Sequence, residues 1–209
     1  MTDSGSCLAN SHHITTQASE WVQRWCHLAT NSGDMLDLAC GSGRHMQWFK
    51  QQGFQTTGVD RDPQALLLAS QHGDVVQADL ENAPWPLMSG GQVRQFDVVV
   101  VTNYLWRALF PVLLQSLAPD GLLLYETFAL GHENVGRPAR PDFLLRPGEL
   151  LQVCQDLHVI AYENGFLSHP DRFVQRIAAI QQPISQHPGV RFTLSAHRFS
   201  PSHVGRGLG

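Results

Sequence analysis

One stretch of the sequence decides the fold: Met35-Leu-Asp37-Leu-Ala-Cys-Gly41-Ser-Gly43-Arg44-His45. Its apolar start, residues 35–38, predicts a short buried strand. Two glycines break the strand, and a helical pattern with Met46 and Phe49 on one face follows and ends at Gly53. A strand, a glycine turn and a helix can present backbone N–H groups to a small ligand without an intervening side chain. A tight turn that binds no ligand gives the same pattern, so the rest of the chain has to decide.

The composition indicates one globular domain. The chain has 209 residues, of which 43% are hydrophobic and 15% charged, enough for a full core. Its formal net charge of −4 offers no basic field for a nucleic acid or an anionic membrane. Lys50 is the only lysine, and no glycine-rich loop ends in Gly-Lys, so Schiff-base and P-loop chemistry are disfavoured.

The cysteines and the N-terminus predict a cytoplasmic protein. The four cysteines are scattered with no CxxC pair, which argues against a zinc site or a disulfide framework and fits a reducing compartment. The polar start lacks the charged and apolar regions of a signal peptide. No apolar run approaches the roughly 20 residues that a membrane span needs. His12 and His13 are interpreted as solvated residues of an arm, so no metal site is expected.

Strands alternate with helices along most of the chain. The expected strands are 35–38, 54–59, 74–78, 96–101, 122–125, 157–162 and 173–180. Helices are expected after Asp62-Pro63, an N-cap acceptor followed by proline, between 105 and 117, where leucines recur every four residues, and from Pro147. This alternation predicts an α/β fold, a single-domain, doubly wound, mostly parallel seven-stranded sheet that ends in an antiparallel hairpin.

Three parts make up the expected domain organisation. Residues 1–13 are a polar arm and residues 14–182 the α/β domain, while residues 183–209 form a basic tail or an added edge strand. Within the domain, four apolar residues of 16–29 share one helical face. This helix either packs on the edge of the sheet or forms a lid over the site, and the two interpretations are compatible.

Polar residues follow the expected strands at their carboxyl ends. They are Asp37 to Gly43, Asp60, Asp79, Asn103-Tyr104 and Glu126-Thr127. Because parallel strands bring these ends to one edge of a sheet, we expect a ligand site there. A dinucleotide fingerprint would have glycine or alanine where this chain has Met46, so NAD and FAD are disfavoured, and without a P-loop lysine a nucleoside triphosphate is disfavoured too.

These residues resemble the class I S-adenosylmethionine-dependent methyltransferases. Asp37-Leu-Ala-Cys-Gly41-Ser-Gly43 is similar to their first motif, an acidic residue followed by three alternating glycines, with Ala39 in place of the first glycine. The resemblance runs from about Met35 to Ile180 in the correct motif order. The run from Arg137 to Glu149 resembles the small bacterial branch that includes tellurite-resistance-type enzymes. The resemblance implies a Rossmann-like methyltransferase domain over 14–182.

The implied cofactor is S-adenosylmethionine. A helix N-terminus and glycine N–H groups suit its carboxylate, and Asp60, 19 residues after Gly41, stands where an acid accepts hydrogen bonds from ribose hydroxyls. By resemblance, Asp79 accepts the adenine amino group and Leu80 lies beside the ring, whereas Asn103 and Tyr104 line the methyl-transfer path. The expected cofactor-binding residues are Asp37, Ala39, Cys40, Gly41, Ser42, Gly43, Asp60, Arg61, Asp79, Leu80, Asn103 and Tyr104.

Methyl transfer is an in-line displacement that depends on positioning, on exclusion of water and, for a protonated nucleophile, on a base. The candidate bases or orienting groups are Tyr104, Glu126, His132 and Glu133. The candidate substrate-binding residues are Arg107, Arg137 and Arg140, which either hold an anion or belong to a solvated, proline-stiffened loop.

The methyl acceptor is expected to be a small molecule. The fourth strand ends in Thr-Asn-Tyr-Leu and lacks the Pro-Pro step typical of methyltransferases that act on exocyclic amines. No cluster of Asp and Asn residues suggests a catechol-type magnesium site. Two alternatives stay open: an RNA or protein methyltransferase, which the basic tail would favour, and a non-catalytic cofactor-binding module. The oligomeric state is not indicated by the sequence.

Overall fold

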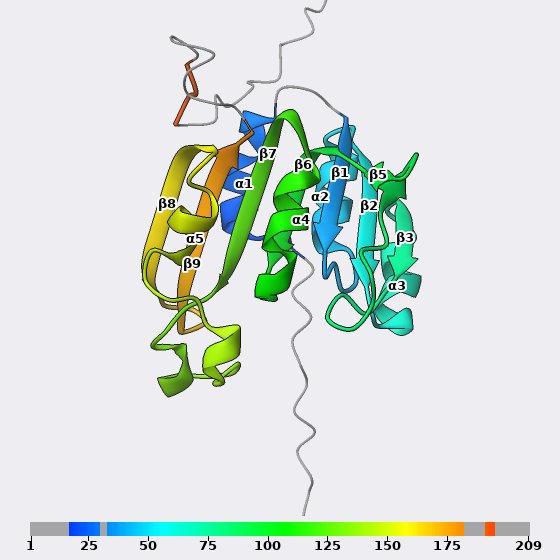
Figure 1. Ribbon diagram of the computed structural model, residues 1–209. Helices are drawn as coiled ribbons and strands as arrows, with labels where there is room; N and C mark the ends of the chain where they lie inside the picture. Colours follow the sequence, from blue (N-terminus) through cyan, green and yellow to red (C-terminus); the bar gives the residue numbers. More distant parts are fainter. Residues whose placement is uncertain (1–16, 30–32, 182–190, 195–209) are drawn as a thin grey trace, which may run out of the picture.

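A seven-stranded sheet forms the centre of the computed structural model, which describes residues 17–29, 33–181 and 191–194. The strand order is β3-β2-β1-β6-β7-β9-β8 (Figure 1). The strands are β1 (Asp34–Leu38), β2 (Gln55–Asp60), β3 (Asp74–Gln77), β6 (Phe96–Thr102), β7 (Leu117–Phe128), β8 (His158–Leu167) and β9 (Arg172–Ile180). The first five strands in this order run parallel, and β9 pairs antiparallel with both β7 and β8. The predicted fold class is confirmed.

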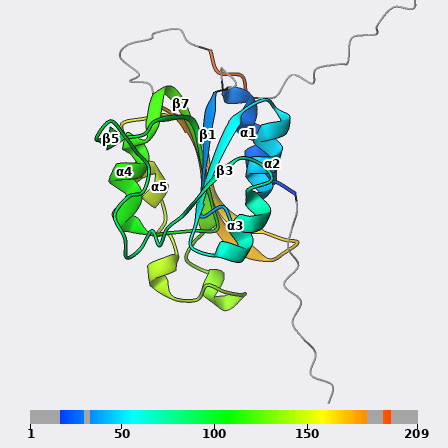
Figure 2. The ribbon, with the colours of Figure 1, turned by 90° about the vertical axis from the view of Figure 1, so that its right-hand side faces the viewer.

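Helices cover both faces of the sheet, so the domain has three layers (Figure 2). One face carries α1 (Glu20–Trp25), α2 (Arg44–Gln51) and α3 (Pro63–Ala69), and the other carries α4 (Phe110–Gln115) and α5 (Glu149–Val153). Short 3₁₀ turns occur at η1 (Cys26–Leu28), η2 (Arg107–Leu109), η3 (His132–Asn134) and η4 (Pro141–Phe143). None of the helices in the described ranges is long and apolar enough to cross a membrane.

The four consecutive valines of β6 show why the sheet is covered by helices on both faces. Val98, Val99, Val100 and Val101 are all fully buried, because alternate side chains point into opposite layers of a doubly covered parallel sheet. Val99 and Val101 belong to the core under α4 and α5, while Val98 and Val100 pack with the tryptophans of α1. Strand β6 is therefore the centre of both cores.

The structure differs from the predicted elements in two places. The leucine-rich stretch 105–117 forms only η2 and the six-residue α4, and Leu117 already starts β7, where it pairs with Phe96. The sequence analysis also missed a small separate hairpin, β4 (Met88–Ser89) and β5 (Gln92–Val93). Its turn consists of Gly90 and Gly91, both with positive φ, and a Gly-Gly pair is a recognised hairpin signal.

The structure describes only a small part of the two ends of the chain. The arm at 1–13 and most of the tail at 183–209 lie outside the described residues, and the four described tail residues, 191–194, contain no strand. Helix α1 packs firmly, since Trp21 is 1% exposed and its indole Nε1 donates to the Ile177 carbonyl at 3.1 Å. The helix therefore packs on the sheet, but on its face over the inner strands β6, β7 and β9 and not at its edge, as the packing interpretation expected. The lid interpretation concerns motion and stays a prediction.

Candidate functional site

The glycine loop between β1 and α2 has an unusual backbone. Ala39, Gly41 and Gly43 all have positive φ, at 55°, 53° and 80°. The alanine that replaces the first family glycine therefore adopts a left-handed conformation, which costs a non-glycine residue about 1–2 kcal/mol. Gly43 is also the N-cap of α2 and lies close to α3, since a Cβ built on Gly43 would stand 2.9 Å from the Ala69 Cα. The loop thus needs glycine both for its dihedral angles and for helix packing.

Gly43→Ala tests this packing, with Gly91→Ala as its control. Both glycines have φ near +80°, but a Cβ on Gly91 meets nothing within 4 Å. We expect Gly91→Ala to lower the free energy of unfolding by about 1 kcal/mol and Gly43→Ala by about 2–4 kcal/mol, because only the latter adds a clash with backbone. Urea unfolding measures both, and equal losses would contradict the packing argument.

Asp60 ties the glycine loop to the end of β2. Its Oδ2 accepts the Gly41 N–H at 2.8 Å and its Oδ1 accepts the Asp62 N–H at 3.0 Å. Asp62 in turn caps α3 by accepting the Gln64 N–H at 2.9 Å, as the Asp-Pro signal predicts. Each Asp60 oxygen keeps a further lone pair for a ligand.

A cavity of about 230 Å³ opens at the carboxyl ends of β1, β2 and β3. It is lined by Ala39, Asp60, Arg61, Ala78, Asp79, Leu80, Glu81 and Tyr104. The structure therefore brings six of the predicted cofactor-binding residues to one cavity, and Ala78 and Glu81 are additions that the sequence analysis missed. Asp79 is held by the Asn82 side chain at 2.9 Å and by the Glu81 N–H at 3.0 Å, hydrogen bonds that lower its pKa and keep it charged.

Asp37 and Cys40 lie deeper than this cavity. Asp37 is 1% exposed, with Oδ1 3.5 Å from His45 Nδ1, and its Oδ2 has no hydrogen-bond partner within the described ranges. Cys40 packs with Met46, and burial raises the pKa of its thiol. Met46, which argued against a dinucleotide, is accommodated because Gly58 leaves room for its sulfur.

A second cavity of about 330 Å³ lies beside the first and shares Arg61, Glu81 and Tyr104 with it. Its other lining residues are Asn103, Leu105, Thr127, Phe128, Pro138 and Phe143. Tyr104 stands in the common wall and is positioned through its backbone carbonyl, which accepts the Tyr125 hydroxyl at 2.9 Å. Burial, and then the nearby carboxylate of Glu81, raise the pKa of the Tyr104 hydroxyl, whose oxygen has no partner among the residues described.

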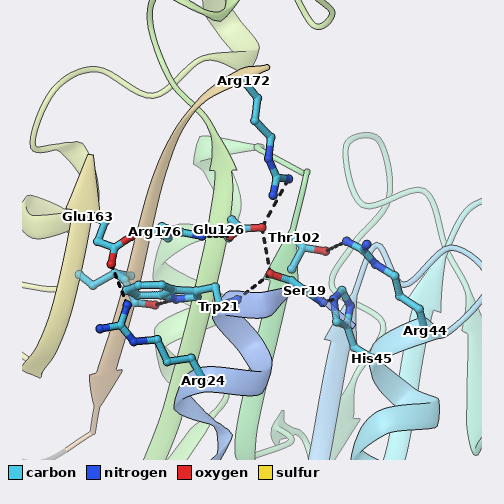
Figure 3. A network of polar contacts seen from close by, with 11 residues as sticks. Ser19, Trp21, Arg24, Arg44, His45, Thr102, Glu126, Glu163, Arg172 and Arg176 are labelled. Atoms are coloured by element: carbon cyan, nitrogen blue, oxygen red, sulfur yellow. Dashed lines mark hydrogen bonds and ion pairs between the residues drawn. The ribbon is translucent and has the colours of Figure 1, made fainter. Parts of the chain in front are cut away.

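The predicted bases Glu126 and His132 line neither cavity. Glu126 is 1% exposed and accepts the Ser19 hydroxyl at 3.1 Å; its carboxylate also pairs with Arg176 at 3.2 Å and Arg172 at 3.7 Å (Figure 3). His132 stacks on Phe128 with ring centroids 4.3 Å apart, and its Nε2 lies 3.0 Å from the Arg137 carbonyl. The structure gives both side chains structural contacts, which argues against the predicted catalytic role.

The alternative base Glu133 is also used locally, because its carboxylate accepts the Gly131 N–H at 2.7 Å. Of all the predicted bases, Tyr104 alone lines a cavity.

The predicted substrate arginines also need correction. Arg107 donates to Glu149 through Nε at 2.6 Å and Nη2 at 3.0 Å, and to the carbonyls of Asp142 and Leu144 at 2.6 and 2.9 Å. A guanidinium committed to four hydrogen bonds is not poised to bind an anion. Arg140 is exposed and pairs with Asp142 at 3.1 Å. None of Arg107, Arg137 and Arg140 lines either cavity. The solvated-loop interpretation fits the exposed Arg137 and Arg140, whereas Arg107 is held by internal contacts.

No group of three or more His, Cys, Asp and Glu side chains within 17–29, 33–181 and 191–194 is arranged to hold a metal ion. The residues that meet at this edge of the sheet are instead carboxylates, the glycine loop and apolar side chains. This set suits a nucleoside with an attached amino acid.

Comparison with known families shows to which family the chain belongs. A model of a methyltransferase domain matches residues 11–176, most of the chain. The chain belongs to this methyltransferase family. The class I S-adenosylmethionine-dependent methyltransferase fold expected from the sequence is confirmed, and with it the family's cofactor.

Similar proteins give the extent of the likeness. YqeM of Bacillus subtilis (strain 168), which carries the name of a methyltransferase, is 30% identical over 125 residues, 56% of this chain and 49% of that protein. An S-adenosylmethionine-dependent methyltransferase from Methanosarcina mazei superposes with a TM-score of 0.58 at 14% identity, covering 75% of this chain and 96% of that one. TehB from Haemophilus influenzae gives 0.57 at 18% identity, covering 71% and 57%.

The two structural matches establish the shared fold. The chain spans about half the length of the curated relatives it matches.

Proposed function

We propose that this protein transfers a methyl group from S-adenosylmethionine to a small-molecule acceptor. The observation that carries the proposal is the pair of adjacent cavities, about 230 and 330 Å³, that share a wall at Tyr104. One cavity has the carboxylates that suit an adenosine, and the other is large enough for a small organic molecule. The methyl donor and the acceptor would thus bind in neighbouring cavities, both beside Tyr104.

The first cavity and the glycine loop fit the cofactor. Asp60 would accept the ribose hydroxyls with its remaining lone pairs, while Asp79 and Leu80 would take the adenine. The buried Oδ2 of Asp37 has no partner within the described part of the chain, and a ligand ammonium would satisfy it. The empty space beside Gly41, where a Cβ meets nothing within 4 Å, lets a ligand approach the backbone. When bound, the cofactor supplies an electrophilic methyl group on a sulfonium.

The chain's own contribution is positioning. Tyr104 separates the cavities and, held by Tyr125, would orient the nucleophilic atom of the acceptor. Burial raises the pKa of the Tyr104 hydroxyl further above its usual value, so this hydroxyl is neutral near pH 7, as an ordinary tyrosine is, and can both donate and accept a hydrogen bond. Asn103 and Arg61 complete the polar rim. An uncharged amine attacks with its own lone pair and releases its proton to water after the transfer, so it needs no strong base. A hydroxyl or thiol acceptor would have to pass its proton to water or to a side chain that lines the cavity as it attacks.

The main alternative acceptor is RNA or protein. Its support is the lack of acidic residues and the presence of Arg191, Arg198 and Arg206 in residues 183–209. The net charge of −4 and the small second cavity favour the small molecule instead. A non-catalytic cofactor-binding domain is the remaining possibility.

A label-transfer experiment separates these functions. The protein is incubated with methyl-labelled S-adenosylmethionine and a cell extract, which is then divided into small-molecule, RNA and protein fractions. We expect label in the small-molecule fraction. Label only in RNA or protein would overturn the proposed acceptor, and cofactor binding without transfer to any fraction would favour the non-catalytic alternative.

A further inference from the structure

We infer that the second cavity takes a flat, uncharged, apolar-bodied acceptor rather than an anion, and that Arg107 acts as a positioning residue that shapes this cavity by holding Phe143. This inference rests on the proposed function, because it names the substrate class of the same site. It replaces the anion-binding role that the sequence suggested for Arg107.

The lining of the cavity is largely apolar. Three of its lining residues are aromatic, Phe128, Phe143 and Tyr104, and Leu105 and Pro138 are aliphatic. Flat rings between flat walls are favoured because aromatic pairs gain about 0.5–1.5 kcal/mol beyond burial. The volume of about 330 Å³ is roughly twice that of a cavity known to hold benzene. One ring with substituents, or two fused rings, suits this space.

Arg107 fixes one wall of the cavity. Its guanidinium donates to the carbonyl of Asp142 and to that of Leu144, the two residues that flank Phe143. Glu149, at the start of α5, holds the other edge of the same guanidinium. The hydrogen bonds to Arg107 and Arg146 outweigh burial and lower the pKa of Glu149, so the pair stays charged. The planar fork of arginine thereby locks the backbone on both sides of an aromatic side chain.

Two other aromatic residues of the lining are fixed in a similar way. Phe128 is stacked on His132, and the hydroxyl of the buried Tyr125 donates to the Tyr104 carbonyl. Three aromatic walls are therefore held by contacts outside the cavity. Such preorganisation lowers the entropy cost of binding a rigid ligand.

The charges at the cavity disfavour an anion. The charged residues that line the second cavity are Arg61 and Glu81, whose charges cancel, and the adjoining first cavity adds the negative Asp60 and Asp79. A carboxylate acceptor would leave water for a cavity with no net positive charge to compensate it. An uncharged amine, thiol or hydroxyl meets no such penalty, and its N–H, S–H or O–H can donate to the unpartnered Tyr104 oxygen.

A matched pair of probes tests the inference without knowledge of the natural acceptor. Fluorine NMR follows 4-fluorophenol and 4-fluorobenzoate, which differ in charge but share the ring, during titration with the full-length protein in the presence of S-adenosylhomocysteine. We expect 4-fluorophenol to bind at least about tenfold more tightly than 4-fluorobenzoate, the size of a modest charge penalty. Equal or tighter binding of the benzoate, or binding of neither probe, would overturn the inference.

Variants of two residues test whether the probe binds in the second cavity. Phe143→Ala removes a half-buried wall and Arg107→Lys removes the two-carbonyl fork, and each is expected to weaken 4-fluorophenol binding at least about fivefold. Leu151→Ala, on an exposed α5 position, is the control and should change nothing. Circular dichroism confirms folding of each variant. If Phe143→Ala and Arg107→Lys bind the probe like the wild type, the inference fails.

A separate measurement distinguishes failure of this inference from failure of the proposed function. Isothermal titration with S-adenosylmethionine reports on the first cavity, where neither Phe143 nor Arg107 contributes lining. We expect both variants to retain wild-type affinity for the cofactor. A wild-type protein that binds 4-fluorophenol but not S-adenosylmethionine would keep the cavity assignment and sink the methyltransferase proposal.

Discussion

Asp60→Ala is expected to reduce the affinity for S-adenosylmethionine by at least about 100-fold. Two hydrogen bonds to a charged acceptor contribute about 1.5–3 kcal/mol each, and Asp60 is the carboxylate that both lines the first cavity and anchors the glycine loop through the Gly41 N–H. Isothermal titration of wild type and variant gives the affinities. A variant that binds like the wild type would contradict the assignment of Asp60 to the ribose.

Two further variants separate ligand contact from loop support. Asp60→Asn keeps an oxygen for the Gly41 N–H but puts an NH2 group where Oδ1 accepts the Asp62 N–H. We therefore expect the affinity to fall and stability to drop by about 1 kcal/mol, the cost of one lost hydrogen bond. Asp62→Ala removes the neighbouring carboxylate, which caps α3 and lines neither cavity. That control should lose about 1 kcal/mol of stability and retain its affinity for the cofactor.

The sheet and the gathering of polar residues at its edge were predictable because their determinants are local. The valine run at 98–101 requires burial on both faces, and Asp62-Pro63 fixes the start of α3. Once the strands are parallel, their carboxyl ends meet, so residues 40 positions apart such as Ala39 and Asp79 line one cavity. Periodicity and topology together suffice for this part.

The roles of the charged residues were not predictable in the same way. Arg107 looked free in the sequence because its partners are Glu149 and two carbonyls 35 and 37 residues away, in a loop with no periodic pattern. Glu126 follows a strand, as a ligand-binding acid would, yet it is enclosed by Ser19 and two arginines of β9. Which partner a charge finds depends on tertiary packing that no single stretch encodes.

Glu126→Ala is expected to lower the free energy of unfolding by about 3–5 kcal/mol, the usual cost of removing one partner from a buried ion pair. The carboxylate joins the Ser19 cap of α1 to Arg172 and Arg176 of β9, and Arg176 continues to Glu163 at 2.5 Å (Figure 3). Its loss leaves the Arg176 guanidinium, whose side chain is only 12% exposed, with one carboxylate instead of two.

Glu163→Gln is the matched control for this network. Glu163 pairs with the same Arg176, but its side chain is 40% exposed and the solvent can replace the lost interaction, so the cost should stay below about 1 kcal/mol. Urea unfolding of both variants gives the difference directly. If Glu126 were instead a catalytic base, Glu126→Gln would abolish methyl transfer while leaving the unfolding free energy and the cofactor affinity at wild-type values. We expect the opposite pattern: a less stable protein whose folded fraction still binds S-adenosylmethionine, because the side-chain contacts of Glu126 connect α1 to the sheet and involve no residue that lines either cavity.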